Sequence, residues 1–212
     1  MVDTSDPANL AAIFKAYDVR GLVPEQIDDD LARKTGNAFV QVTQAPTVVV
    51  GHDMRPSSPG MAGAFADGAA QAGADVVMIG LASTDQLYFA SGHLGHAGAM
   101  FTASHNPAQY NGIKLCRTHA QPIGLDTGLA EIRDVVASGE FVTATRSGSI
   151  GLASWLGKLP SSSKYISISS TRAAPRRSKT AGAVSPAIPL PASTTTLSLR
   201  PRTGARLSTW AA

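Results

Sequence analysis

The stretch "MFTASHNPAQYNGIKL", residues 100–115, holds the residues whose types and spacing could do chemistry. Ser104 follows a short apolar run, and a serine exposed in a loop at the end of a strand can act as a nucleophile. His105 and Lys114 could move protons or stabilise an anion beside that serine. The alternative interpretation is a polar turn, because Ser, His, Asn and Pro are all common turn residues.

The sequence lacks the motifs of several other enzyme classes. It has no G-x-S-x-G nucleophile elbow, no G-x-x-x-x-G-K-[ST] phosphate loop and no G-x-G-x-x-G dinucleotide motif. Its single cysteine, Cys116, excludes an intrachain disulfide and is typical of a small buried strand residue. Hydrolysis by a serine elbow and nucleotide binding through a glycine-rich loop are therefore not indicated.

Two further clusters resemble metal sites but have simpler interpretations. The acidic run Asp28–Asp30 precedes a predicted helix, where carboxylates cap the first turn and interact favourably with the helix dipole. His93 and His96 have a spacing that could share a ligand, yet Gly92 and Gly95 beside them indicate the end of a helix. We expect no metal ion at either cluster.

The elements that must position Ser104 follow from the hydrophobic pattern, in which β-branched runs alternate with segments of helical period. We predict strands over 47–51, 74–80, 97–102 and 111–116 and helices over 28–42, 58–73, 83–92 and 126–139. Ser58 is the predicted N-cap of the second of these helices, with Pro59 at its first position. The alternation predicts an α/β fold, a mixed sheet of about four strands between helices.

The charge of the chain changes abruptly near residue 140. Residues 1–140 hold 8 basic and all 15 acidic residues, a net charge of −7, whereas residues 141–212 hold 10 basic residues and no acidic ones. We therefore predict one domain over 1–145 and a Ser/Thr/Ala/Pro/Arg-rich tail over 146–212 that is disordered or translated out of frame. An evolved basic tail is the competing hypothesis. Because the tail lacks interleaved aromatic residues and any known binding module, nucleic acid is not the expected partner.

No segment of the sequence indicates export or membrane insertion. The N-terminus has no basic start followed by an apolar core, and no apolar run is long enough to cross a bilayer. We expect a cytoplasmic protein without a membrane partner.

Three motifs together carry a family resemblance. "FKAYDVRG" (14–21), "GHDMRPSSP" (51–59) and "TASHNP" (102–107) followed by "YNGIKL" (110–115) occur in one order across residues 14–140. In this, the chain resembles the N-terminal domain of the α-D-phosphohexomutases, in particular the phosphomannomutase/phosphoglucomutase branch. The resemblance implies interconversion of hexose 6-phosphate and hexose 1-phosphate through a phosphoserine and a bisphosphate intermediate.

The resemblance also implies roles for individual residues. Ser104 would carry the phosphoryl group and, through its phosphate, contact Mg²⁺. Arg20 and Lys114 would act in proton transfer and charge stabilisation, and His105 would donate a hydrogen bond to phosphate or substrate. Tyr17 and Asn106 would shape the loop or the sugar pocket. Gly51, Asp53 and Arg55 would brace the site.

The family motifs that complete such an active site are missing from this sequence. A D-G-D-x-D-R loop would hold Mg²⁺, and G-E-x-S-G-H and R-x-S-G-T-E-P loops would bind the sugar and its phosphate, yet none occurs here. We therefore expect a truncated mutase with an incomplete Mg²⁺ site, hexose 1,6-bisphosphate as activator and little activity alone. An exposed interdomain face could lead to self-association. The alternative is a non-catalytic phosphoprotein or partner-binding domain.

Overall fold

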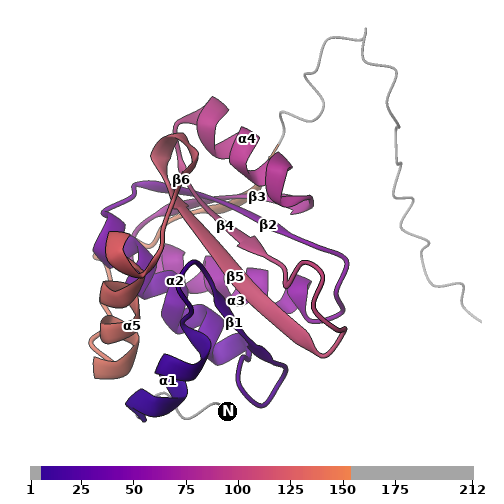
Figure 1. Ribbon diagram of the computed structural model, residues 1–212. Helices are drawn as coiled ribbons and strands as arrows, with labels where there is room; N and C mark the ends of the chain where they lie inside the picture. The colour runs from indigo at the N-terminus through magenta and orange to yellow at the C-terminus, as the bar shows by residue number, and fades with distance from the viewer. Residues whose placement is uncertain (1–5, 154–212) are drawn as a thin grey trace, which may run out of the picture. The chain divides into compact units, whose positions relative to one another are not determined.

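The computed structural model describes residues 6–153, which form a mixed β-sheet with helices on both faces (Figure 1). Seven strands make up this sheet, in the order β1-β5-β4-β2-β3-β7, with β6 paired to β5. Their bounds are β1 Val19–Leu22, β2 Thr47–His52, β3 Asp75–Leu81, β4 Ala97–Phe101, β5 Tyr110–Arg117, β6 Gln121–Pro122 and β7 Ile150–Leu152.

Five α-helices and two short 3₁₀ helices connect these strands within the described residues. They are α1 Pro7–Ile13, α2 Asp29–Thr43, α3 Ser58–Gln71, α4 Thr84–Leu94, η1 Thr118–Ala120, η2 Leu125–Thr127 and α5 Leu129–Ser138. Helices α2, α3 and α5 cover one face of the sheet, and α4 covers the other (Figure 1). The fold thus has three layers, as expected for strands that alternate with helices.

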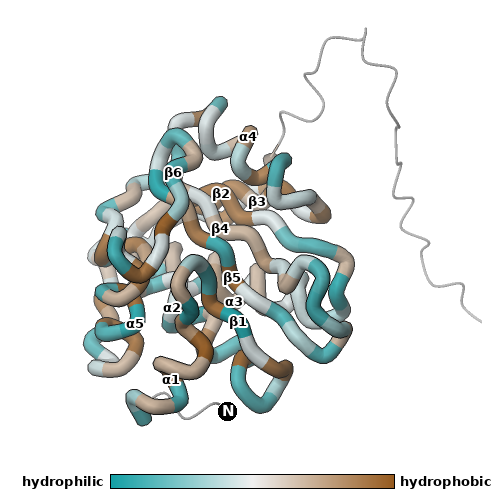
Figure 2. Tube along the Cα trace, in the orientation of Figure 1, coloured by the Kyte–Doolittle hydropathy of each residue, from teal (hydrophilic) through white to brown (hydrophobic). Residues whose placement is uncertain are grey.

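Each face of the sheet has its own apolar core. The larger core joins α2 and α3 to the sheet and includes the aromatic series Phe39, Phe65 and Phe101. The smaller core packs Leu87 and Ala90 of α4 against the central strands. Figure 2 shows the apolar residues concentrated in β2, β3 and β4, the strands that are covered on both faces.

The direction of the strands places the candidate loop. Strands β2, β3 and β4 run parallel, so their carboxyl ends meet at one edge of the sheet. Strand β5 then returns antiparallel to β4, and β1 pairs antiparallel to β5. The loop between β4 and β5, which contains Ser104, therefore lies beside the end of β2, where Asp53 follows.

The four predicted strands and four predicted helices are all present, although the sheet is larger than the four strands expected. The added strands β1, β6 and β7 are two to four residues long, too short to give a clear period. One cap was also assigned wrongly. Ser57, not Ser58, is the N-cap of α3, because the Ser58 hydroxyl is buried and donates to Asp53.

The other local predictions agree with the structure. Asp28 caps α2 by accepting a hydrogen bond from Leu31 N. Helix α4 ends at Leu94, followed by Gly95 in the left-handed conformation that helix ends favour. Cys116 is buried in β5, and burial, partly offset by hydrogen bonding with Ser91 and Gly98, raises the pKa of its thiol.

The described fold continues beyond residue 145, the predicted end of the domain. Asn37 of α2 exchanges hydrogen bonds with the backbone of Val142, donating from Nδ2 and accepting at Oδ1. Strand β7 then pairs parallel to β3 from Ile150 onward. Residues 141–153 thus form part of the same folded unit. The remainder of the predicted tail lies outside the described residues.

Candidate active site

Ser104 is exposed in the loop between β4 and β5, in a backbone conformation that is unusual for serine. Its φ angle is +54°, in the left-handed region that costs about 1 kcal/mol for a residue with a Cβ atom. Two hydrogen bonds hold this turn, one from Ser104 N to Thr102 Oγ1 at 3.0 Å and one from Asn106 N to Ala103 O. The backbone at Ser104 is therefore held in place, and the residue is exposed.

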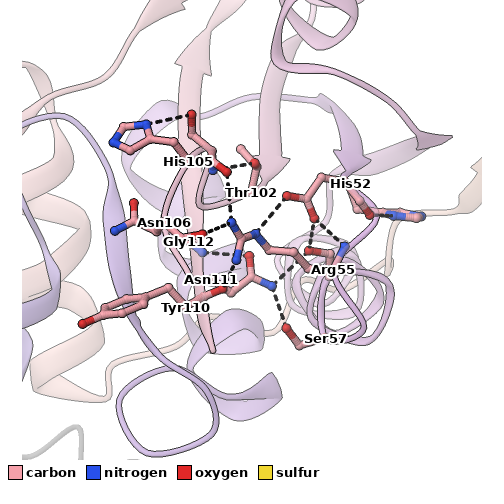
Figure 3. Close-up of polar contacts among 12 residues, drawn as sticks. His52, Arg55, Ser57, Thr102, His105, Asn106, Tyr110, Asn111 and Gly112 are labelled. Atoms are coloured by element: carbon pink, nitrogen blue, oxygen red, sulfur yellow. Dashed lines mark hydrogen bonds and ion pairs between the residues drawn. The ribbon is translucent and has the colours of Figure 1, made fainter. Parts of the chain in front are cut away.

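Arg55 fastens the loop from the neighbouring end of β2 (Figure 3). Its guanidinium group uses all five of its N–H donors. Nε donates to Asp53 Oδ2 at 3.2 Å, and the two Nη atoms donate to backbone carbonyl oxygens at 2.7–3.0 Å. Those carbonyls belong to Ser104, Asn106, Pro107 and Tyr110. The predicted bracing by Arg55 is thus a direct contact with the loop backbone.

Asp53 orients Arg55 in turn. Its carboxylate accepts hydrogen bonds from Arg55 N at 2.9 Å and from Ser58 Oγ at 2.6 Å. Burial alone raises the pKa of Asp53, but the hydrogen bonds from Ser58, Arg55 N and Thr102, together with the Arg55 charge, lower it overall. Asp53 is therefore a stable anion that keeps the Arg55 side chain in place.

Arg20 reaches the loop from β1, on the other side. Its Nη1 donates to Asn106 Oδ1 at 3.1 Å, so it contacts the second residue after Ser104. Its Nη2 pairs with Asp18 Oδ2, and the same oxygen pairs with Lys114 Nζ at 3.1 Å. Arg20 and Lys114, predicted separately from two motifs, thus share one carboxylate beside the loop.

His105 is the side chain closest to the hydroxyl of Ser104. Ser104 Oγ lies 3.4 Å from His105 Nδ1, a long contact for a hydrogen bond. Both side chains are exposed, so neither is fixed by packing. A neutral imidazole at this place can accept the hydroxyl proton, and an imidazolium can donate to a phosphate.

An open pocket of about 810 Å³ adjoins Ser104. Loop residues form one wall, and the ends of β2 and β3 with the start of α4 form the other. The lining residues include Ser104, Asn106, Asp53, Met54, Leu81 and Gln86. Both polar loop groups and exposed apolar side chains therefore face the same open space next to the serine.

The structure does not bring every predicted residue to the loop. Tyr17 is 81% exposed and lies next to Gly124, and the structure shows no contact between its side chain and the Ser104 loop. Three residues that were not predicted contribute instead. Thr102 caps the turn at Ser104, Asn111 donates to the hydroxyls of Ser57 and Ser58, and Asp18 joins the two cations. The signal for Asp18 in the sequence is its position directly before β1 and two residues before Arg20, a spacing that places two side chains on one face of a strand.

The described residues do not supply the ligands that Mg²⁺ requires. No group of three or more His, Cys, Asp or Glu side chains in residues 6–153 is arranged to hold a metal ion. The two carboxylates near the loop, Asp18 and Asp53, are already paired with Arg and Lys side chains. Among the described residues, the Ser104 oxygen is the only group predicted as a Mg²⁺ ligand.

None of the helices within residues 6–153 has both the length and the apolar character needed to span a lipid bilayer.

Comparison with known proteins gives one consistent result. A family model described as "Phosphoglucomutase/phosphomannomutase, alpha/beta/alpha domain I" matches residues 11–143. The chain is 51% identical over 127 residues to a protein named "Phosphohexose mutases" from Xanthomonas campestris, and 44% identical over 129 residues to a phosphomannomutase from Salmonella typhimurium. These matches cover 59% and 60% of this chain.

The solved structures agree with the sequence relatives. A phosphoglucomutase/phosphomannomutase family protein from Burkholderia thailandensis superposes with a TM-score of 0.62 at 34% identity, over 74% of this chain and 35% of that one. The chain spans 28% of the length of the Xanthomonas and Salmonella proteins. Because the matching model covers more than half of the chain and the fold agrees, this protein belongs to the phosphoglucomutase/phosphomannomutase family through its domain I.

Proposed function

We propose that this chain provides the phosphoserine domain of a hexose-phosphate mutase, with Ser104 Oγ as the atom that carries the phosphoryl group. The observation that supports this most is the exposed Ser104 hydroxyl on a clamped loop, with Arg20 bound to that loop and Lys114 paired beside it. Phosphoryl transfer depends mainly on positioning and on stabilisation of negative charge. A serine on a loop held by hydrogen bonds, with a guanidinium group bound to that loop and an ammonium group paired to the same carboxylate, supports both needs.

The proposed reaction moves one phosphoryl group in each direction. A hydroxyl oxygen of the hexose monophosphate attacks the phosphorus on Ser104, the new P–O bond to the sugar forms, and the P–O bond to the serine breaks. The sugar hydroxyl gives its proton to a base, and the serine oxygen takes up a proton. The other phosphoryl group of the resulting bisphosphate then moves to Ser104 by the reverse steps.

The residues around Ser104 have distinct proposed tasks in this reaction. Arg20 and Lys114 stabilise the charge on the transferring group, and Lys114 or His105 holds the proton that the serine oxygen exchanges. Asn106 orients Arg20, while Asp53 and Arg55 keep the loop rigid. Tyr17, because it is exposed, is proposed to contact the sugar only once the rest of an active site surrounds it.

Mg²⁺ and a bisphosphate activator are part of this proposal, but this chain does not contain all of the groups they need. When bound, Mg²⁺ would neutralise charge on the phosphoryl group, and its ligands beyond Ser104 have to come from outside the described residues. Hexose 1,6-bisphosphate would load the enzyme by giving one phosphoryl group to Ser104. Because the sequence lacks the metal, sugar and phosphate motifs, we propose that this chain alone has little turnover.

A domain graft tests the proposed role. Residues 11–143 of this chain would replace the matching segment of the Xanthomonas campestris relative, and mutase activity would be measured by a coupled assay with mannose 1-phosphate and glucose 1-phosphate. We expect turnover that Ser104→Ala abolishes. A graft that folds but shows no turnover, or one whose turnover survives Ser104→Ala, would contradict the proposal.

The same assay on the chain itself tests the second part of the proposal. We expect no turnover with either sugar phosphate in the presence of Mg²⁺ and the bisphosphate. Turnover that depends on Ser104 would mean that the chain supplies the missing groups in another way. Stable phosphate on Ser104 without turnover, also in the graft, would favour the alternative of a non-catalytic phosphoprotein.

Self-association remains a separate part of the proposal. Several large apolar side chains are exposed near β3, β7 and α4, among them Leu81, Leu152 and Phe89. Exposed apolar surface of this kind favours association. Sedimentation velocity over a range of protein concentrations would show it as a rise in the average sedimentation coefficient, and an unchanged coefficient would exclude it.

A further inference from the structure

Asp18 is a nearly buried carboxylate between two cations. Its residue surface is 5% exposed, and one of its oxygens, Oδ2, contacts both Arg20 Nη2 and Lys114 Nζ. Tyr88 of helix α4 lies close enough to Asp18 to interact with its charge. Burial, with smaller contributions from the charges of Cys116 and Asp18, raises the pKa of Tyr88, so the phenol stays neutral near pH 7.

The strand register explains why these three charges meet. Arg20 of β1 is the antiparallel partner of Gly112 in β5, and Lys114 follows Gly112 by two residues. Asp18 precedes Arg20 by two residues. Asp18 lies directly before β1, whose first pair is Val19 with Ile113, so the same register continued by one residue brings Asp18 to Lys114.

Arg20 connects the cluster to the Ser104 loop. Arg20 Nη1 donates to Asn106 Oδ1, and the backbone oxygen of Asn106 accepts from Arg55. Arg20 Nε is buried and has no hydrogen-bond partner among the described residues. One donor of Arg20 is therefore left free next to the loop, while the other two nitrogens are held by Asp18 and Asn106.

We propose that Asp18 is a positioning residue that holds Arg20 and Lys114 side by side against the Ser104 loop. This inference rests on the proposed function of Ser104 as the phosphoryl carrier. Two cations in contact repel each other, and each long side chain has many rotamers. A shared buried carboxylate offsets the repulsion and fixes both side chains, so that the cations are in place before a phosphoryl group arrives.

A positioning role and a simple charge effect predict opposite results. Asp18 is an anion near the phosphoryl group, so if its charge alone mattered, its removal would make a phosphate on Ser104 easier to ionise. If Asp18 holds the cations in place, its removal lets them move away, and the phosphate becomes harder to ionise. The second pKa of the phosphate reports which effect is larger.

The experiment uses the full chain with phosphoserine incorporated genetically at position 104. The second pKa of the phosphate, ordinarily about 6, is measured by ³¹P NMR in the parent, Asp18→Asn and Asp18→Glu. His105 is present in every sample, so the comparison isolates Asp18. Asp30→Asn is the matched control, because Asp30 also pairs with one lysine and one arginine, Lys34 at 2.9 Å and Arg33 at 3.9 Å.

We expect the phosphate pKa in the parent to lie below that of a phosphoserine peptide, and Asp18→Asn to raise it by about 1, a tenfold change in proton affinity. Asp30→Asn should leave it within a few tenths of the parent value. Asp18→Glu keeps the charge but moves it by one methylene group, and should give an intermediate rise. It serves as the decisive variant if Asp18→Asn does not fold.

Two results would overturn the inference and can be told apart. If the parent pKa is low and Arg20→Ala or Lys114→Ala raises it, but Asp18→Asn lowers it or leaves it unchanged, the cations act without positioning by Asp18. An Asp18→Glu variant with the parent value leads to the same conclusion. If the parent phosphate titrates like the free peptide, the cations do not face Ser104, and the proposed function fails together with the role of Asp18.

Discussion

The backbone of Ser104 has a conformation that most side chains avoid. Its φ of +54° is not a conformation that serine prefers, since glycine adopts it at lower free-energy cost. The hydrogen bonds of the turn hold the serine in this conformation. A serine kept at a site that favours glycine is consistent with a need for the hydroxyl. Strain of this type is frequent at functional sites.

The strain at this residue predicts a stability difference. Ser104→Gly should be more stable than Ser104→Ala by about 1 kcal/mol, since only glycine relieves the left-handed backbone. Urea unfolding of both variants measures the difference. Ala108, in the same loop but without a positive φ, provides the control, and Ala108→Gly should be destabilising. Equal stability of the two Ser104 variants would mean that the turn is not strained.

The lowered pKa of Asp53 predicts a pH dependence of stability. A carboxyl group whose pKa is lower in the folded state stabilises the fold above its ordinary value of 3.8, and that contribution is lost as the pH falls below this value. Asp53→Asn should therefore reduce the free energy of unfolding more at pH 6 than at pH 3. Urea unfolding at both pH values checks this, and an equal reduction at both would contradict it.

At the scale of the elements, the loop between β4 and β5 is held mainly by a side chain from another segment. Three carbonyl oxygens of this loop, and that of Tyr110 at the start of β5, accept hydrogen bonds from Arg55, and the loop has no helix or strand of its own. The planar guanidinium group is suited to this, because its donors lie in a fixed fork that an ammonium group lacks.

Replacement of Arg55 by lysine should make the loop more mobile while the positive charge of the side chain is kept. Arg55→Lys leaves several carbonyl oxygens without partners and should lower the free energy of unfolding by about 2 kcal/mol. Hydrogen exchange of the amides in residues 102–110 should become faster. Arg33→Lys on α2, where the arginine is 46% exposed, is the control and should change neither quantity. Unchanged exchange in Arg55→Lys would show that the loop is rigid without the clamp.

Helices α2 and α3 pack so closely that glycine is required at their contact. A Cβ atom on Gly68 would lie 1.9 Å from Arg33 O, and one on Gly36 would lie 2.2 Å from Phe65 O. Both distances are far below a van der Waals contact, and the opposing atoms are backbone. The two helices would have to separate to accept a larger residue at either position.

This contact predicts opposite effects for two substitutions in one helix. Gly68→Ala should destabilise the domain by about 3 kcal/mol, because the helices are forced apart. Gly63→Ala, also in α3 but with nothing within 4 Å of the added Cβ, should stabilise it by up to about 1 kcal/mol through helix propensity. Thermal unfolding of both variants measures the difference, and a similar melting temperature for the two would contradict the packing argument.

At the scale of the whole molecule, the sequence predicted the central strands and the covering helices correctly because their periods are long and regular. Strands β1 and β7 were missed because three or four residues carry too little pattern. The motifs indicated the candidate site residues, including Ser104 and Arg20, and the roles of these residues stay predictions. The part that was missed, the contact of Asp18 with Lys114, depends on the pairing of β1 with β5, which links residues 96 positions apart.

The measurement that tests the central claim most directly is the identity of the residue that carries phosphate during turnover. The grafted mutase containing residues 11–143 would be mixed with labelled hexose 1,6-bisphosphate, quenched in parallel in acid and in mild alkali, and mapped by mass spectrometry. We predict acid-stable phosphate on Ser104 and none in the Ser104→Ala graft. Acid-labile phosphate on His105, or phosphate on a peptide without Ser104, would contradict the assignment of this serine as the phosphoryl carrier.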